Sequence, residues 1–103
     1  MGIKSLKSGE NIFFGCFQNK ELVSIASTII RYEDFAFLGN IYTKPNCRGK
    51  GLGTKTVSHL IDFLFEKADV KAAQLYTTEE KMTFYNKLGF NVIETLHKFY
   101  EVL

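Results

Sequence analysis

The residues best suited to chemistry gather in one short segment, CRGKGLGTKT, at positions 47–56. Glycine lets a ligand approach the backbone because it has no Cβ, and the free N–H groups at a helix N-terminus attract anions. Arginine and lysine add full positive charges and hydrogen-bond donors. The segment holds three glycines, Gly49, Gly51 and Gly53, and three basic residues, Arg48, Lys50 and Lys55. It therefore predicts an anion site, and phosphate is the expected anion.

Three phosphate-binding patterns can be compared with this segment. The P-loop pattern G-x-x-x-x-G-K-[ST], started at Gly49, places Thr54 where the second glycine must stand. The dinucleotide pattern G-x-G-x-x-G fails at the same threonine, and its strand context also differs. The pattern [RQ]-x-x-G-x-[GA] is satisfied in full by Arg48, Gly51 and Gly53. A nucleotide-binding protein that uses this segment for ATP is thereby disfavoured.

The elements before this segment are predicted to be strands. Residues 12–17, 21–30 and 35–43 are rich in aromatic and β-branched residues, and the short breaks between them favour hairpins. We therefore expect an antiparallel meander. Alternation in its second strand assigns two faces: Val23, Ile25 and Ile29 on one, and Ser24, Ala26 and Thr28 on the other.

The elements after the segment alternate helix and strand. Apolar residues recur every three or four positions over 51–67, which predicts a helix, and 72–78 is a strand expected to run parallel to the third one. Thr77 and Glu80 have capping-box spacing for a second helix that ends at Gly89, and 91–102 is extended. The order is β-β-β-α-β-α-β, an α/β (α+β) fold with a mixed, mostly antiparallel sheet.

Composition limits the classes of protein that fit. With 103 residues, 46% of them hydrophobic, residues 1–103 suit a single domain with one core. A net charge of +2 on 13 basic and 11 acidic residues is too balanced to indicate nucleic-acid binding. No apolar run approaches the roughly 20 residues that span a bilayer, so we expect no membrane segment. Cys16 and Cys47 lack metal-ligand spacing, which predicts no metal site and a reducing, cytoplasmic environment.

Two segments resemble signatures of a known family, the GCN5-related N-acetyltransferases (GNAT). They are NIYTKPNCRGKGLGTKTV (40–57) and FYNKLGF (84–90), and the similarity extends over residues 10–103. The resemblance implies that acetyl-coenzyme A binds with its pyrophosphate on the backbone amides from Arg48 to Thr54. It also implies that the pantetheine arm follows the third strand of the meander. The implied cofactor-binding residues are Asn40, Ile41, Tyr42, Thr43, Arg48, Gly49, Lys50, Gly51, Leu52, Gly53, Thr54, Tyr85 and Asn86.

The resemblance also implies a reaction, the direct transfer of an acetyl group to the primary amine of a small molecule or a peptide. Tyr85 matches the tyrosine that many family members use as general acid toward the leaving thiolate, although a tyrosine at an inward helical position can also be a core residue. For the base we expect Glu33, with a chain of water molecules as the alternative. A coenzyme A-binding module or partner subunit without turnover is the alternative function.

The chain departs from the family at its N-terminal end. Family members begin with a strand and two helices that form much of the acceptor site, whereas only about ten residues precede the meander here. A naturally short form, a piece of a longer protein and a second subunit that supplies the missing part are all compatible with this. Because one face of the sheet would stay uncovered, we expect an open acceptor groove and a homodimer.

Overall fold

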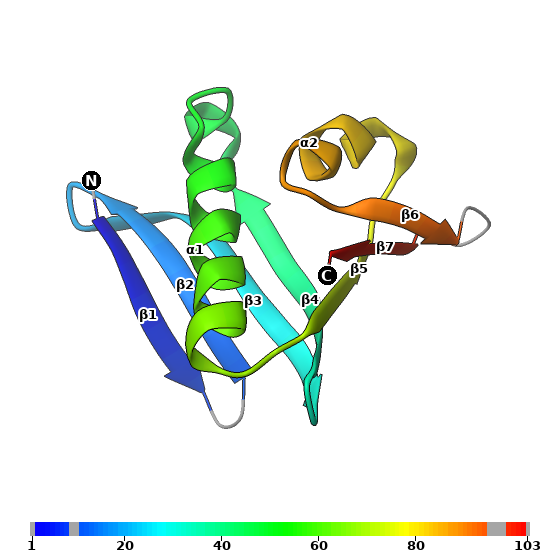
Figure 1. The fold of residues 1–103 in the computed structure, drawn as a ribbon. Helices are drawn as coiled ribbons and strands as arrows, with labels where there is room; N and C mark the ends of the chain where they lie inside the picture. Colours follow the sequence, from blue (N-terminus) through cyan, green and yellow to red (C-terminus); the bar gives the residue numbers. More distant parts are fainter. Residues whose placement is uncertain (1, 9–10, 95–98, 103) are drawn as a thin grey trace.

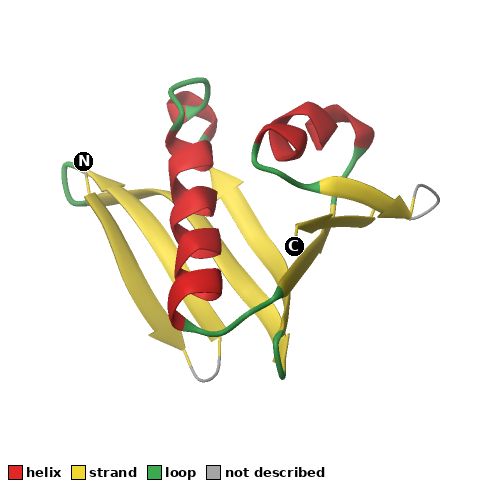
Figure 2. Cartoon of the chain, viewed as in Figure 1, coloured by secondary structure: helices red, strands yellow, loops and turns green. Residues whose placement is uncertain are grey.

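The computed structural model describes residues 2–8, 11–94 and 99–102, which form one seven-stranded sheet with two helices (Figures 1 and 2). The strands are β1 (Gly2–Ser8), β2 (Asn11–Gln18), β3 (Glu21–Tyr32), β4 (Phe35–Thr43), β5 (Ala72–Tyr76), β6 (Asn91–Glu94) and β7 (Phe99–Val102). The helices are α1 (Leu52–Lys67) and α2 (Met82–Lys87), each preceded by a short 3₁₀ turn, Pro45–Cys47 and Glu79–Lys81.

The sheet has the order β1-β2-β3-β4-β5-β7-β6. Strands β1 to β4 form an antiparallel meander, and β5 pairs in parallel with β4 after the crossover through α1. These pairings confirm the predicted mixed sheet and the predicted parallel pair, which follows because a helix connection returns the chain in the same direction.

Strand β1 was not predicted from the sequence. Its seven residues include two lysines and two serines but only two large apolar side chains, Ile3 and Leu6, which hides the usual strand signal. The structure pairs it with β2 over its whole length, from Gly2 opposite Phe17 to Ser8 opposite Asn11. The short N-terminal segment therefore extends the meander by one edge strand, and the predicted element order lacks this strand.

Two further details of the predicted order need correction. The last extended segment is divided into β6 and β7, which pair antiparallel with each other, while residues 95–98 lie outside the described residues. The second helix has Lys81 as its N-cap and no side-chain cap hydrogen bond, so the capping box assigned to Thr77 and Glu80 is wrong. A 3₁₀ turn, closed by a hydrogen bond from the Lys81 N–H to the Thr78 carbonyl, begins the helical segment instead.

The predicted faces of β3 are wrong at Val23, because a bulge at this residue shifts the alternation of the strand. The pairing with β2 passes from Leu22 opposite Phe17 to Ser24 opposite Cys16, so Val23 is the extra residue and is buried beside Ser24. The rest of the predicted grouping agrees with the burial: Ser24, Ala26 and Thr28 are buried, whereas Ile25 is half-buried and Ile29 is 41% exposed. The Thr28 hydroxyl accepts a hydrogen bond from the Ile12 N–H at 3.0 Å and donates one to Asn11 Oδ1 at 3.1 Å. Those two bonds offset the cost of burying a polar side chain.

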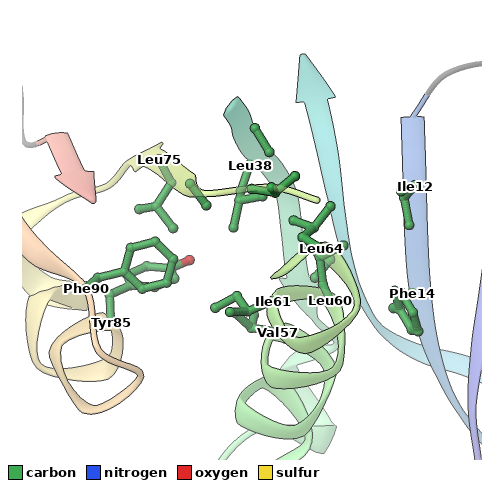
Figure 3. Packing of buried hydrophobic residues seen from close by; sticks show 14 residues of the cluster. Ile12, Phe14, Leu38, Val57, Leu60, Ile61, Leu64, Leu75, Tyr85 and Phe90 are labelled. Carbon is green, nitrogen blue, oxygen red and sulfur yellow. The ribbon is translucent and has the colours of Figure 1, made fainter. Parts of the chain in front are cut away.

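The main core lies between α1 and the sheet (Figure 3). Val57, Leu60 and Leu64 of α1 are fully buried against residues of β2 to β5, and Tyr85 and Phe90 close the same cluster from the α2 side. A smaller cluster joins Cys16, Val23, Cys47 and Leu52, and both cysteines are free thiols. The described residues contain no helix that is both long enough and apolar enough to span a bilayer.

Several large apolar side chains remain exposed. They are Leu22, Ile29, Ile30, Tyr32, Tyr42 and Tyr76, all from β3, β4 and β5. In β4 the buried Ala36 and Leu38 alternate with the half-buried Phe35 and Phe37, so these two phenylalanines lie on the face away from α1.

Candidate active site

A cavity of about 400 Å³ lies where the N-terminus of α1, the end of β4 and α2 meet. Its lining comes from these three elements, from the loop that joins β4 to α1 and from the 3₁₀ turn before α2: Ile41, Tyr42, Thr43, Cys47, Arg48, Gly49, Gly51, Leu52, Gly53, Thr54, Glu80, Lys81, Phe84 and Tyr85. A volume of this size is typical of small-molecule sites.

The first turn of α1 supplies hydrogen-bond donors to this cavity. Gly51 is the N-cap with φ 79°, Gly49 has φ 78°, and no side chain caps the helix. The N–H groups of residues 52–54 have no acceptor within the helix, and the helix dipole adds about half a positive charge at this end. A Cβ built on Gly49 or Gly51 would meet no atom within 4 Å. Glycine is thus required here by the backbone conformation and leaves the donors open to a ligand.

Gly53 has a different role, because the backbone of α1 here approaches β4 and α2 closely. A Cβ at this position would lie 3.1 Å from Thr43 Oγ1 and 3.6 Å from Phe84 Cζ. Thr43 is itself held by a hydrogen bond of 2.8 Å between its hydroxyl and that of Ser24 in β3. The missing side chain therefore fixes how closely the first turn of α1 packs against the end of β4.

The end of β4 offers a strand edge to the cavity. The parallel ladder with β5 stops at Leu38 opposite Leu75, and Asn40, at φ 52°, interrupts the extended backbone just beyond it. Beyond this point the described pairings of β4 are with β3 alone. The backbone of residues 41–43 can therefore pair with an extended ligand on the side where β5 has diverged.

Arg48 lies across this strand edge. Its Nε–H donates a hydrogen bond of 2.8 Å to the carbonyl oxygen of Thr43, and its guanidinium carbon lies 5.3 Å from the centre of the Tyr42 ring. The cation–π contact and the hydrogen bond together hold the positive charge next to the α1 N-terminus. An anion bound to the helix amides would therefore lie close to a positioned cation.

A second cavity, of about 280 Å³, lies beside the first one between β4 and β5. Ile41, Lys81 and Tyr85 line both cavities. The other lining residues of the second cavity are Leu38, Gly39, Asn40, Leu75, Tyr76, Thr77 and Thr78. The two cavities therefore meet at the point where the parallel strands separate, and Tyr85 lies at their junction.

Tyr85 is held rigidly at this junction. Its side chain is 5% exposed and packs edge-on against the rings of Phe84 and Phe90, with centroid separations of 4.9 and 5.8 Å. Figure 3 shows its hydroxyl directed toward the α1 side of the core. Burial raises the pKa of the Tyr85 hydroxyl to about 12, because the charged phenolate loses its hydration. The group is consequently a protonated donor throughout the neutral range.

The structure brings most of the residues predicted for the site together. All of the expected cofactor-binding residues line one of the two cavities except Lys50 and Asn86, which are exposed and line neither. Glu33 is also exposed, in the turn between β3 and β4 with φ 52°, at the opposite end of β4 from the cavities. The structure therefore does not bring Glu33 to the site.

Sequence reasoning missed four lining residues of the first cavity: Cys47, Glu80, Lys81 and Phe84. Lys81 precedes Tyr85 by four positions and Phe84 adjoins it, so their proximity to the predicted acid was the available signal. No set of three or more His, Cys, Asp or Glu side chains suited to a metal ion occurs in the part of the chain that the structure describes.

The family model described as Acetyltransferase (GNAT) family matches residues 3–90 of the sequence. The chain belongs to the GNAT acetyltransferase family. This agrees with the resemblance seen in the two sequence signatures, and it extends the match to β1. No curated protein matches the sequence significantly.

Solved structures share the GNAT fold of this chain. ElaA from Escherichia coli superposes with a TM-score of 0.80 at 18% identity, over 93% of this chain and 70% of that one. The PaiA N-acetyltransferase from Thermoplasma acidophilum, solved in complex with coenzyme A, gives 0.76 at 23% identity, over 89% and 60%. Tetrahymena GCN5 gives 0.78 at 14% identity, over 92% and 69%. The GNAT chain described here thus spans about 60–70% of these proteins.

Proposed function

We propose that this GNAT protein is an acetyl-coenzyme A-dependent N-acetyltransferase. One observation carries the proposal: the buried, protonated Tyr85 lies at the junction of two cavities, one of which contains an uncapped helix N-terminus rich in glycine. A thioester donor and an amine acceptor can therefore meet beside a proton donor.

The first cavity suits coenzyme A in two respects. The N–H groups of residues 52–54 and the cation of Arg48 would hold the pyrophosphate, and the backbone of residues 41–43 would pair with the amide groups of the pantetheine arm. The coenzyme A in the complex of the PaiA protein from T. acidophilum supports this assignment by fold. Acetyl-coenzyme A supplies the activated acetyl group as a thioester.

The chain would promote direct transfer between the two substrates. The free-base nitrogen of a primary amine attacks the thioester carbonyl carbon, the C–N bond forms and the C–S bond breaks. Tyr85 donates its hydroxyl proton to the departing thiolate and regains a proton from the ammonium group that forms on the product nitrogen. No carboxylate among the described residues lines the second cavity, so the amine is expected to enter as the free base.

Replacing Tyr85 by phenylalanine tests this mechanism. Thiol release from acetyl-coenzyme A over a panel of primary amines should fall about 10²- to 10⁴-fold in kcat, the range for loss of a general acid. The Kd for coenzyme A, measured by calorimetry, should stay unchanged because phenylalanine preserves the ring packing. Tyr32→Phe is the matched control, since Tyr32 is 68% exposed and lines neither cavity. An unchanged rate in Tyr85→Phe would refute the assigned acid.

One outcome would identify the alternative to catalysis. Tight coenzyme A binding without thiol release for any amine would identify a coenzyme A-binding module.

The homodimer remains a prediction, and the exposed apolar side chains of β3 to β5 favour it. Sedimentation at several concentrations checks it, and a monomer at all of them would contradict it.

A further inference from the structure

The second cavity crosses the sheet. Leu38 and Leu75, the last paired residues of β4 and β5, are buried in the core on the α1 side, as Figure 3 shows. Gly39 and Tyr76 follow them directly and so face the opposite side. All four residues line the second cavity. The lining thus extends from Tyr85 to residues on the face of the sheet that α1 leaves uncovered.

The opening on that face is apolar and aromatic. Tyr76 is 56% exposed, and its ring packs against that of Phe37 in an edge-on contact with centroids 5.4 Å apart. The side chain of Ile29 lies over Gly39, since a Cβ built there would come within 2.9 Å of Ile29 Cγ2. A rim of this kind offers ring faces and edges to a flat apolar group.

The charges around the second cavity restrict the acceptor further. Among its described lining residues, Lys81 alone carries a full charge at neutral pH, and that charge is positive. The acidic side chains nearest in sequence to the β4 half of the lining, Glu33 and Asp34, are in the turn at the far end of β4. Glu80, next to Lys81 in the sequence, lines the first cavity and not the second. A polyamine in the second cavity would therefore place additional ammonium groups near the cation of Lys81, which is unfavourable in a partly desolvated site.

We propose that the acceptor is a small primary amine joined by a short linker to an aromatic ring. The amine passes between β4 and β5 toward Tyr85 while the ring rests on the rim formed by Tyr76, Phe37 and Ile29. Tyr76 is then a specificity residue that selects the body of the acceptor. This inference rests on the proposed N-acetyltransferase function, and it adds the acceptor class and its direction of entry.

The first experiment measures binding and does not depend on turnover. The protein is saturated with coenzyme A and titrated with 2-phenylethylamine while backbone amide resonances are recorded. We expect shifts at Gly39, Asn40 and residues 76–78, and no comparable shifts on titration with spermidine. If spermidine moves these resonances at lower concentration than 2-phenylethylamine does, the acceptor class is wrong, whether or not the protein turns over.

The second experiment compares acceptors in Tyr76 variants. In Tyr76→Ala, kcat/KM for 2-phenylethylamine should fall about tenfold, as loss of a packed aromatic contact predicts, while kcat/KM for ethylamine should stay within about twofold. Tyr76→Phe should restore the aromatic substrate. Tyr32→Ala is the matched control, because it removes an exposed tyrosine of β3 that lines neither cavity.

The outcomes separate the two proposals. Equal loss for both amines in Tyr76→Ala would show a structural role and overturn the specificity role, while turnover itself would still support the acetyltransferase function. Absence of turnover with every amine, together with the expected shifts, would overturn the acetyltransferase proposal but support the acceptor class. Absence of shifts at the rim overturns the inference in either case.

Discussion

The Gly51→Ala variant tests whether the first turn of α1 holds a diphosphate. Gly51 is the N-cap with φ 79°, and a Cβ there would meet no protein atom within 4 Å. The added methyl group thus causes no clash within the protein, but it forces a residue with a Cβ into the left-handed region, which costs about 1–2 kcal/mol of folding stability. It also occupies space beside the free amides of residues 52–54, where a ligand oxygen would lie.

The expected loss of affinity follows from the number of hydrogen bonds at risk. A hydrogen bond to a charged group contributes about 1.5–3 kcal/mol, so displacement of one phosphate oxygen from one amide should weaken coenzyme A binding about 10- to 100-fold. Titration calorimetry measures the Kd of coenzyme A, and urea denaturation measures the free energy of unfolding in the same variants.

Gly89→Ala is the matched control for this test. Gly89 also has a positive φ, 97°, but lies in the turn after α2 and lines neither cavity. It should lose stability by a similar amount and bind coenzyme A as the unmodified chain does. If Gly51→Ala binds coenzyme A with unchanged affinity, the diphosphate does not lie on the α1 amides. If both variants bind equally weakly, general destabilisation explains the loss.

Two further predictions concern packing and pH. Gly53→Val should destabilise the fold by about 1–3 kcal/mol in urea denaturation, because the new side chain overpacks the 3.1 Å space next to Thr43 Oγ1, whereas Gly53→Ala should stay within about 1 kcal/mol of the unmodified chain. With an acceptor whose own pKa lies below 9, kcat/KM should rise as the amine loses its proton and stay level to pH 10, because the pKa of about 12 keeps Tyr85 protonated there. A halving of kcat/KM at pH 10 would indicate an ordinary tyrosine pKa of about 10 instead.

The backbone geometry of the predicted anion site could be inferred from the sequence, because it depends on groups that glycine exposes. Gly49 and Gly51 have φ near 79°, a conformation that side chains with a Cβ rarely adopt, so their identity reports the local geometry directly. The parallel pairing of β4 with β5 was equally accessible, since the intervening helix determines the direction of return. Tyr85 could be placed inward by its helical spacing from Met82 and Leu88, but the two cavities that it lines could not be predicted.

Features that depend on single-residue shifts could not be predicted. A bulge at Val23 in β3 buries this residue beside Ser24, and the left-handed Asn40 ends the regular part of β4. The pattern of apolar and polar residues in the sequence does not mark where such a bulge occurs. One extra residue nevertheless moves each following side chain of the strand to the other face of the sheet. Strand β1 was missed for a related reason, because its lysines and serines lack strand propensity and its pairing with β2 supplies the stability.

The same difference distinguishes the two binding events of the proposed reaction: binding of the acetyl donor depends on the backbone, whereas choice of the acceptor depends on individual side chains. The proposed donor binding depends on main-chain amides and one positioned arginine, which the backbone of the fold places. Acceptor choice depends on which side chains follow Leu38 and Leu75 where β4 and β5 part, and there Gly39 and Tyr76 leave an opening with an aromatic rim. A few substitutions at such a rim can change the acceptor without disturbing the donor site. Substitutions that probe which acceptor this chain uses should therefore be placed at the rim of the second cavity, and residues 47–56 should be left unchanged.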